Sequence, residues 1–106
     1  MSVPELADDD RRAALAKAKQ ARQDRAALKV ALKAGEVSLD EVLAAADRND
    51  VVAKMRAVEV LESLPGIGKV TAQHLMEELA IADSRRLRGL GSRQRAALLD
   101  RFGSSA

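Results

Sequence analysis

The chain of 106 residues contains no cysteine, one histidine and a single aromatic residue, Phe102. The absence of cysteine excludes disulfides and thiolate metal sites. So little aromatic surface argues against single-stranded nucleic-acid binders and RNA-recognition modules, because both stack bases on aromatic rings. No stretch resembles a signal peptide or a membrane-spanning run, so we expect a location in the cytoplasm or the nucleoid.

The formal net charge of +2 hides a strong segregation of charge along the sequence. Residues 1–10 hold four acidic residues, among them Glu5, and residues 36–50 hold five against one arginine. Residues 11–33 hold eight basic residues against one aspartate, and residues 83–95 hold five arginines against one aspartate. Two basic blocks separated by acidic ones predict two contact surfaces for an anionic partner.

The most informative stretch is residues 61–76, LESLPGIGKVTAQHLM, where two glycines two positions apart separate two helical patterns. Pro65 stops the first helix, and Gly66 and Gly68 allow positive φ and close backbone approach. Backbone N–H groups at the start of the second helix would then point outward beside the positive end of its dipole, which suits phosphate oxygens. The pattern is that of the helix-hairpin-helix of sequence-independent DNA binders, and a purely structural helix turn is the alternative.

The remaining segments also read as helices, so the predicted fold class is all-α. Residues 8–34 are Ala-rich and free of Gly and Pro, which predicts one helix of about 40 Å at about 1.5 Å per residue. Its N-terminal half offers only Leu15 as a large apolar residue, so we expect that half to project from the core. A projecting helix with a basic stripe is well placed to lie along DNA, whereas a merely solvated face is the alternative.

Local signals divide the rest of the chain. Gly35 ends the long helix, and Ser38 with Glu41 forms a capping box for a short second helix. Asn49 or Asp50 caps a third helix that is expected to continue to residue 61. A fourth helix spans residues 69–80, and a turn-rich link leads to a fifth, for which Ser92 is an acceptable N-cap. We therefore expect an extension over residues 1–35 and a compact helical domain over residues 36–106.

Several basic residues break local preferences. Lys69, Arg93 and Arg95 lie in the first turns of helices, where the dipole disfavours cations by about 0.3–1 kcal/mol each. An incoming phosphate would reverse that penalty, although pairing with Glu77, Glu78 or Asp100 is an alternative. Arg85, Arg86 and Arg88 repel one another unless an anion lies between them. Lys54 and Arg56 could add contacts to the DNA backbone, and surface solubility explains them equally well.

Taken together, LESLPGIGKVTAQHLMEELAI and SRRLRGLGSRQRAALLDRF resemble the actinobacterial integration host factor family, over nearly the whole chain. The segment from Leu61 to Phe102 is also similar to the helix-two-turns-helix of a small-subunit ribosomal protein. The resemblance implies a nucleoid-associated protein that binds duplex DNA as a monomer with little sequence preference. It further implies DNA bending, chromosome compaction and support of recombination by a phage integrase.

The candidate DNA-binding residues fall into three groups. The resemblance assigns the hairpin contact to Gly66, Gly68 and Lys69, and a basic segment to Arg85, Arg86 and Arg88. The family often has a basic residue where this chain has Thr71, whose hydroxyl can still donate to a phosphate. We predict one surface that combines the hairpin with the basic segment and a second along the long helix. The full prediction is Gly66, Ile67, Gly68, Lys69, Thr71, Arg85, Arg86, Arg88, Ser92, Arg93, Arg22, Lys29 and Lys33.

Two other classes of function are less well supported. Glycosylase-lyases share the hairpin but place a catalytic lysine two positions after its second glycine, where this chain has Val70. His74, the only histidine, has no second His or Cys with which to hold a metal. We therefore predict no catalytic residue, no metal and no cofactor. An RNA-binding module related to the ribosomal protein remains the alternative function.

Overall fold

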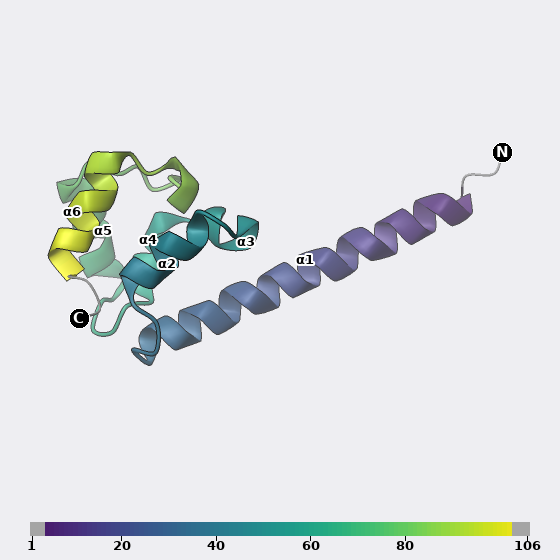
Figure 1. Ribbon diagram of the computed structural model, residues 1–106, viewed down its shortest axis with the longest axis horizontal. Coiled ribbons are helices and arrows are strands. Elements are labelled where there is room, and N and C mark those ends of the chain that lie inside the picture. The colour runs from purple at the N-terminus through teal and green to yellow at the C-terminus, as the bar shows by residue number, and fades with distance from the viewer. Residues whose placement is uncertain (1–3, 103–106) are drawn as a thin grey trace.

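The computed structural model describes the backbone of residues 4–102 and the side chains of residues 8–102. The side chain of Glu5 and the predicted domain's last residues, 103–106, therefore lie outside the described part. Within that part the fold is all-helical, as predicted, and measures 57 × 27 × 25 Å (Figure 1). The elements are α1 (Pro4–Lys33), α2 (Leu39–Ala46), α3 (Asp50–Ala53), α4 (Ala57–Glu62), α5 (Lys69–Glu78), the 3₁₀ helix η1 (Leu87–Gly89) and α6 (Ser92–Phe102).

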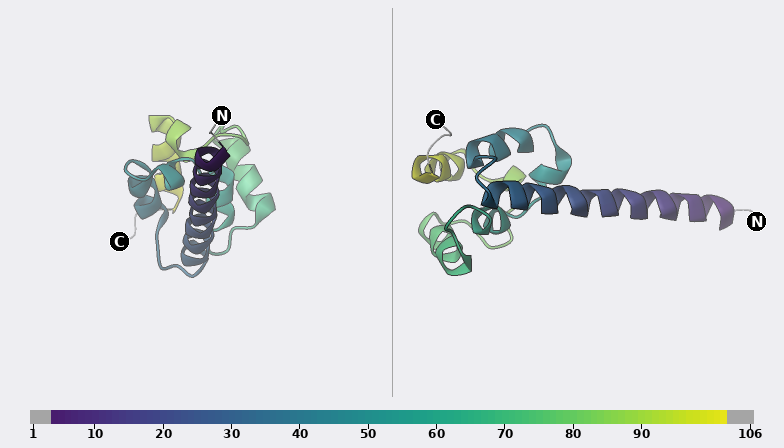
Figure 2. Two further views of the ribbon diagram at one scale, coloured as in Figure 1. Left: turned by 90° about the vertical axis from the view of Figure 1, so that its right-hand side faces the viewer. Right: turned by 90° about the horizontal axis from the view of Figure 1, so that it is seen from below.

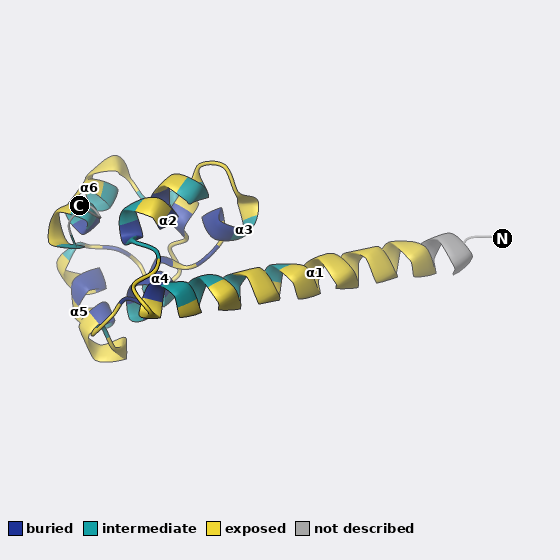
Figure 3. Cartoon of the chain, turned by 60° about the horizontal axis from the view of Figure 1, so that its bottom comes forward, coloured by how far each residue is buried: buried dark blue, intermediate teal, exposed yellow. Residues whose placement is uncertain are grey.

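Helix α1 projects from a compact body formed by the other helices (Figures 1 and 2). Leu15 is 62% exposed, and residues 8–20 are all exposed, so this stretch of α1 buries little surface against the body. Burial begins only at Ala21 and increases to Leu32, which is fully buried (Figure 3). The projection predicted from the scarcity of large apolar residues is thus what the structure shows.

Two of the predicted helix ends carry the expected hydrogen bonds. Gly35 has φ +75°, and the amides of Gly35 and Glu36 donate to the carbonyls of Leu32 and Ala31 at 3.1 and 2.9 Å. These are the two bonds of a Schellman motif, which ends α1. Ser38 and Glu41 form both halves of the capping box that starts α2.

The single helix predicted from residue 49 or 50 to residue 61 is wrong. Asn49 caps α3 as expected, but α3 ends at Ala53, and α4 starts only at Ala57. Between them the chain forms an isolated antiparallel bridge, Arg56 to Arg86. The apolar period survives the break because Met55, 1% exposed, still enters the core. A contact with a segment thirty residues away cannot be read from helical periodicity.

Two further boundaries differ from the prediction. Helix α5 ends at Glu78 because Ala80 adopts φ +55° and closes a Schellman motif without glycine: its amide donates to Glu77, and that of Ile81 donates to Met76. Ser92 is the first residue of α6 rather than its N-cap. Gly91 takes the capping position, with its amide bonded to the Gln94 side chain at 3.0 Å.

One hydrophobic core joins all helices of the body and the end of α1 (Figure 3). Its largest fully buried side chains are Leu32, Leu43, Met55, Leu61, Met76, Leu98, Val42 and Val60. Removing a leucine of this kind costs about 2–5 kcal/mol in other proteins. The core therefore fixes the root of α1 and the two helices that flank the hairpin.

Candidate nucleic-acid interface

The hairpin joins α4 to α5 as the sequence predicts, but its two glycines have different roles. Gly66 adopts φ +76°, a conformation that favours glycine. Gly68 has φ −96° and ψ −174°, which is ordinary extended backbone, so the predicted need for positive φ applies to Gly66 alone. A Cβ at Gly68 would meet nothing within 4 Å. The missing side chain there leaves open space in front of α5.

The start of α5 presents free donors to that space. Within the described residues, the backbone amides of Gly68, Lys69, Val70 and Thr71 have no hydrogen-bond partner, and Gly68 offers no capping side chain. The first turn contains no acidic residue, and Lys69 is exposed beside the amides. Unpaired N–H groups at the positive end of a helix form a binding site for a phosphate. Ile67 is half-buried, packs against the core and anchors the loop.

Lys33 holds the hairpin to the end of α1. Its ammonium donates to the carbonyl oxygens of Glu62 and Leu64 at 3.0 and 3.2 Å. These carbonyls belong to the last turn of α4 and to the residue before Pro65. Two of its three donors thus serve the protein, which gives Lys33 a positioning role that its sequence position did not suggest.

The three arginines of the basic segment are exposed but unequal. Arg85 donates to the Gly89 carbonyl at 2.8 Å, and a Cβ on Gly89 would come within 3.1 Å of the Arg85 side chain. Arg86 donates to the carbonyl of Lys54. Arg88, in η1, makes no hydrogen bond within the described residues. The predicted repulsion is therefore relieved in part by backbone carbonyls, and Arg88 is the guanidinium left most available.

The basic residues at the start of α6 also differ in whether they bind other groups of the protein. Ser92 and Arg93 are exposed. Arg95 instead makes a bidentate bond to Asp47, with both distances 3.0 Å, and donates to the Leu43 carbonyl. The hydrogen bond from Arg95 lowers the pKa of the Asp47 carboxyl below its ordinary value, and the same bond raises the pKa of Arg95. Arg95 thus joins α6 to α2.

Glu78, one of the carboxylates suggested as an alternative partner at the helix starts, is used differently. It lies at the end of α5 and pairs with Arg101 of α6 rather than with Lys69, Arg93 or Arg95. This ion pair ties the C-terminal ends of α5 and α6 together, so Glu78 does not neutralise a cation at either N-terminal end.

The hairpin and the basic segment do not form one surface. They lie at opposite ends of the body, with the hairpin near the root of α1 and η1 on the far side of α4 (Figure 1). The bridge between Arg56 and Arg86 instead brings the basic segment beside residues 54–56 and Arg25 of α1. The predicted grouping is therefore corrected, because the long-range bridge decides which cations are neighbours.

The basic stripe of α1 is present along its length. Arg22 is exposed and Lys29 is half-buried. Sequence reasoning missed Arg25, which lies one helical turn from both and reaches the basic segment through the fold. No local signal distinguishes it, because its neighbours come from residues 54–86.

Two features are absent from the described part of the chain. Among the side chains of residues 8–102, no group of three His, Asp or Glu could hold a metal ion. Residues 4–102 contain no helix long and apolar enough to cross a membrane. His74 is exposed on α5.

Comparison with known proteins places these features in a family. Residues 32–102 match the S13-like H2TH domain model. The integration host factor of Mycobacterium tuberculosis is 53% identical over 105 residues, covering 99% of this chain and all of that protein. The integration host factor of Streptomyces coelicolor is 50% identical and covers 99% of this chain and 98% of its own length.

A solved structure of sIHF bound to an 8-base-pair palindromic DNA superposes with a TM-score of 0.80 at 52% identity. The match covers 82% of this chain and 98% of that one. Both relatives and fold agree with the resemblance expected from the hairpin and the basic segment. The chain therefore belongs to the actinobacterial integration host factor family, with its S13-like H2TH domain in residues 32–102.

Proposed function

We propose that the protein binds duplex DNA through its backbone with little sequence specificity, and that it bends and compacts the DNA. The observation that carries this proposal is the row of amides from Gly68 to Thr71, beside Lys69, that have no hydrogen-bond partner among the residues the structure describes. The 52% identical relative whose structure contains DNA supports it. Phosphates are common to all sequences, so amides and cations that bind them confer no base preference.

The candidate residues form two DNA surfaces. The hairpin surface consists of Gly66, Ile67, Gly68, Lys69 and Thr71. The second surface consists of the basic segment (Arg85, Arg86, Arg88, Ser92 and Arg93) and the α1 stripe (Arg22, Lys29 and Lys33). In this scheme residues 1–35 act as an arm and residues 36–106 as the DNA-binding body. Lys33 acts indirectly, because its ammonium holds the carbonyls next to the hairpin.

Bending follows from the separation of the two surfaces. A straight duplex cannot follow two separated surfaces that are not collinear, so under this proposal it must curve to contact both. The curvature costs of order 1–6 kcal/mol, which the additional phosphate contacts offset. This deformation is the basis on which a monomer would compact the nucleoid and support a phage integrase acting on the same DNA.

We propose an architectural role and no catalysis. Val70 occupies the position at which the lyases have their catalytic lysine. It is 70% exposed beside the hairpin, and the ionisable residue next to it in the same turn is Lys69. An assay for cleavage at an abasic site tests this proposal. Strand cleavage that depends on Lys69 would contradict it.

The experiment that tests the function is a titration of a duplex labelled with a fluorescent donor and acceptor at its two ends. If about six phosphates are contacted, log K should fall with log salt with a slope of roughly −5. Bound protein should also raise energy transfer, since a curved duplex brings its ends together. A slope near zero would contradict phosphate binding, and unchanged transfer would leave a binder that does not bend DNA.

Competition with a structured RNA at equal salt separates this function from the RNA-binding alternative. We expect the duplex DNA to compete better, since the one aromatic side chain of the body, Phe102, is half-buried against the core and little aromatic surface is left for stacking unpaired bases. A clear preference for RNA would reject the proposed function.

A further inference from the structure

Four basic side chains line one hollow of about 300 Å³ where α1 meets the body. Three parts of the chain contribute them: α1, the break between α3 and α4, and the residue before η1. The buried side chain of Met55 lies at the hollow as well. We call it the junction pocket, and its lining residues are Arg25, Lys54, Met55, Arg56, Glu59 and Arg86.

The backbone forces two of these cations together. Ala57 donates to the Arg85 carbonyl and Leu87 donates to the Met55 carbonyl, both at 2.9 Å. These bonds flank Arg56 and Arg86, which are therefore a non-hydrogen-bonded antiparallel pair, the type in which Cα atoms approach to about 4.5 Å. Like charges directly opposite each other in such a pair are destabilising. An anion between the two guanidiniums would relieve the repulsion.

The two carboxylates nearby neutralise only part of the positive charge of the junction pocket. Glu59 lies 3.5 Å from Arg56, and Asp50 lies 3.5 Å from Lys54. The Lys54, Asp50 and Arg56 side chains are at least half exposed, and ion pairs of that kind contribute little. Half-buried Arg25 has no carboxylate within 4 Å in the described part of the chain. Two positive charges in excess therefore remain around one hollow.

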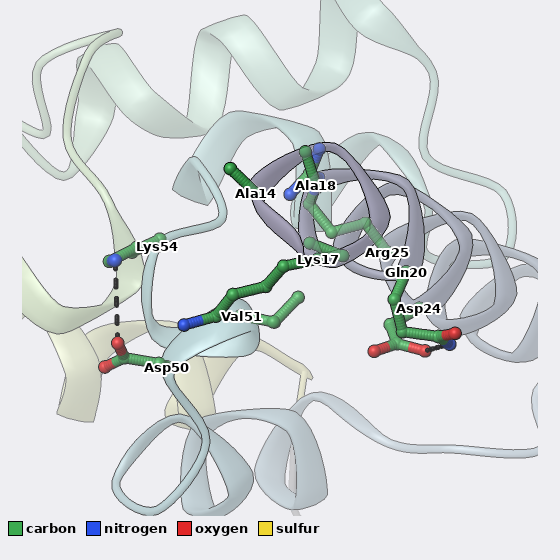
Figure 4. Close-up of a pocket in the computed structure, with 10 residues that line it drawn as sticks. Ala14, Lys17, Ala18, Gln20, Asp24, Arg25, Asp50, Val51 and Lys54 are labelled. Atoms are coloured by element: carbon green, nitrogen blue, oxygen red, sulfur yellow. Dashed lines mark hydrogen bonds and ion pairs between the residues drawn. The ribbon is translucent and has the colours of Figure 1, made fainter. Parts of the chain in front are cut away.

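Space leads into the pocket from one side. Arg25 and Lys54 also line an adjoining groove of about 430 Å³ between α1 and α3 (Figure 4). Its α1 wall includes small side chains, Ala14, Ala18 and Ala21. Lys17, Gln20 and Asp24 line the same wall beside these alanines, so a phosphate that approaches along the groove passes both small and charged side chains of α1.

We propose that the junction pocket binds a backbone phosphate of duplex DNA, with Arg25 and Arg56 as contacts and Arg86 shared with the basic segment. This inference rests on the proposed function. Arg25 lies one helical turn from Arg22 and from Lys29, so a phosphate in the pocket makes the α1 stripe and the basic segment one continuous track. The hairpin surface remains separate from this track.

The test compares Arg25→Ala and Arg56→Ala with Arg48→Ala, which removes the same charge from an exposed turn outside every proposed surface. Binding to one duplex is measured by fluorescence anisotropy over a series of salt concentrations. Each pocket variant should bind roughly tenfold more weakly and lose about 0.9 from the salt slope, as expected for one lost phosphate contact. Arg48→Ala should keep the wild-type slope, and Arg25→Lys should recover most of the lost slope. Thermal unfolding by circular dichroism confirms that each variant is folded.

Two outcomes would overturn different parts of the reasoning. If the wild-type protein binds with a steep salt dependence and both pocket variants match Arg48→Ala, the junction pocket does not bind phosphate. If the wild-type protein itself shows no salt-dependent binding, the proposed function is wrong, and the proposal of a phosphate in the junction pocket is wrong with it.

Discussion

The hairpin makes a sharp prediction because its two glycines differ in backbone conformation. Gly66→Ala places an L-residue at φ +76°, with nothing within 4 Å of the new Cβ, so the cost is backbone strain alone. Left-handed backbone costs a non-glycine residue about 1–2 kcal/mol. For a domain of this size each kcal/mol lowers Tm by about 4–8 °C.

Gly68→Ala should behave in the opposite way. At φ −96° alanine is unstrained and its Cβ meets open space. The poorer N-cap costs about 0.5–1 kcal/mol, which the reduced freedom of the unfolded chain offsets by about 0.4–1 kcal/mol. Stability should therefore change little. The methyl group would stand in front of the free amides, and losing a charge-assisted hydrogen bond to phosphate weakens binding by roughly tenfold or more.

The assay pairs thermal unfolding with DNA titration for both variants. We expect a lowered Tm for Gly66→Ala and a wild-type Tm with weakened binding for Gly68→Ala. If Gly68→Ala keeps both its Tm and its affinity, the amides of α5 do not contact DNA. If it unfolds as readily as Gly66→Ala, the assignment of strain to Gly66 alone is wrong.

Ala80→Gly should raise the free energy of unfolding by about 0.5–1 kcal/mol in urea titrations, because glycine adopts φ +55° without strain, and a lower value would contradict the Schellman assignment. The lowered pKa of Asp47 stabilises the fold above its unfolded pKa of about 3.9, and this contribution disappears as pH falls through the folded-state pKa. Asp47→Asn should thus weaken the loss of stability on acidification below about pH 4, measured by urea unfolding at each pH. Arg88→Ala should weaken DNA binding at unchanged Tm, since no hydrogen bond within the described residues holds that side chain, whereas unchanged affinity would make η1 a solvated loop. Deleting residues 1–20 should lower DNA affinity and leave the cooperative unfolding of the body, followed by far-UV circular dichroism, intact; a product that does not unfold cooperatively would show that this half of α1 packs more than its exposure indicates.

What could be predicted from the sequence is what local chemistry decides. The capping box at Ser38, the Schellman motif at Gly35 and the positive φ of Gly66 each depend on residues within one turn. The projection of α1 also followed from composition, since a helix without large apolar residues has nothing to bury. The hairpin could therefore be recognised and placed before any coordinates.

What could not be predicted depends on contacts between distant segments. The break in the expected third helix and the place of the basic segment share one cause, the bridge between Arg56 and Arg86. The partners of Arg95 and Lys33 are likewise Asp47 and the end of α4, far from them in sequence. Charge patterning showed which residues were anomalous, but only tertiary structure shows which of them share a surface.

If both proposed surfaces bind DNA, the placement of the hairpin and the basic segment at opposite ends of the body makes the protein bivalent toward DNA. When one surface is bound to an isolated duplex, the other meets the same duplex at a high effective concentration, and curvature is the outcome. Where duplexes are crowded, a neighbouring helix competes for the second surface without any deformation cost. The same monomer would then crosslink two DNA segments, so the ratio of protein to DNA and the local density of DNA would choose between bending and bridging.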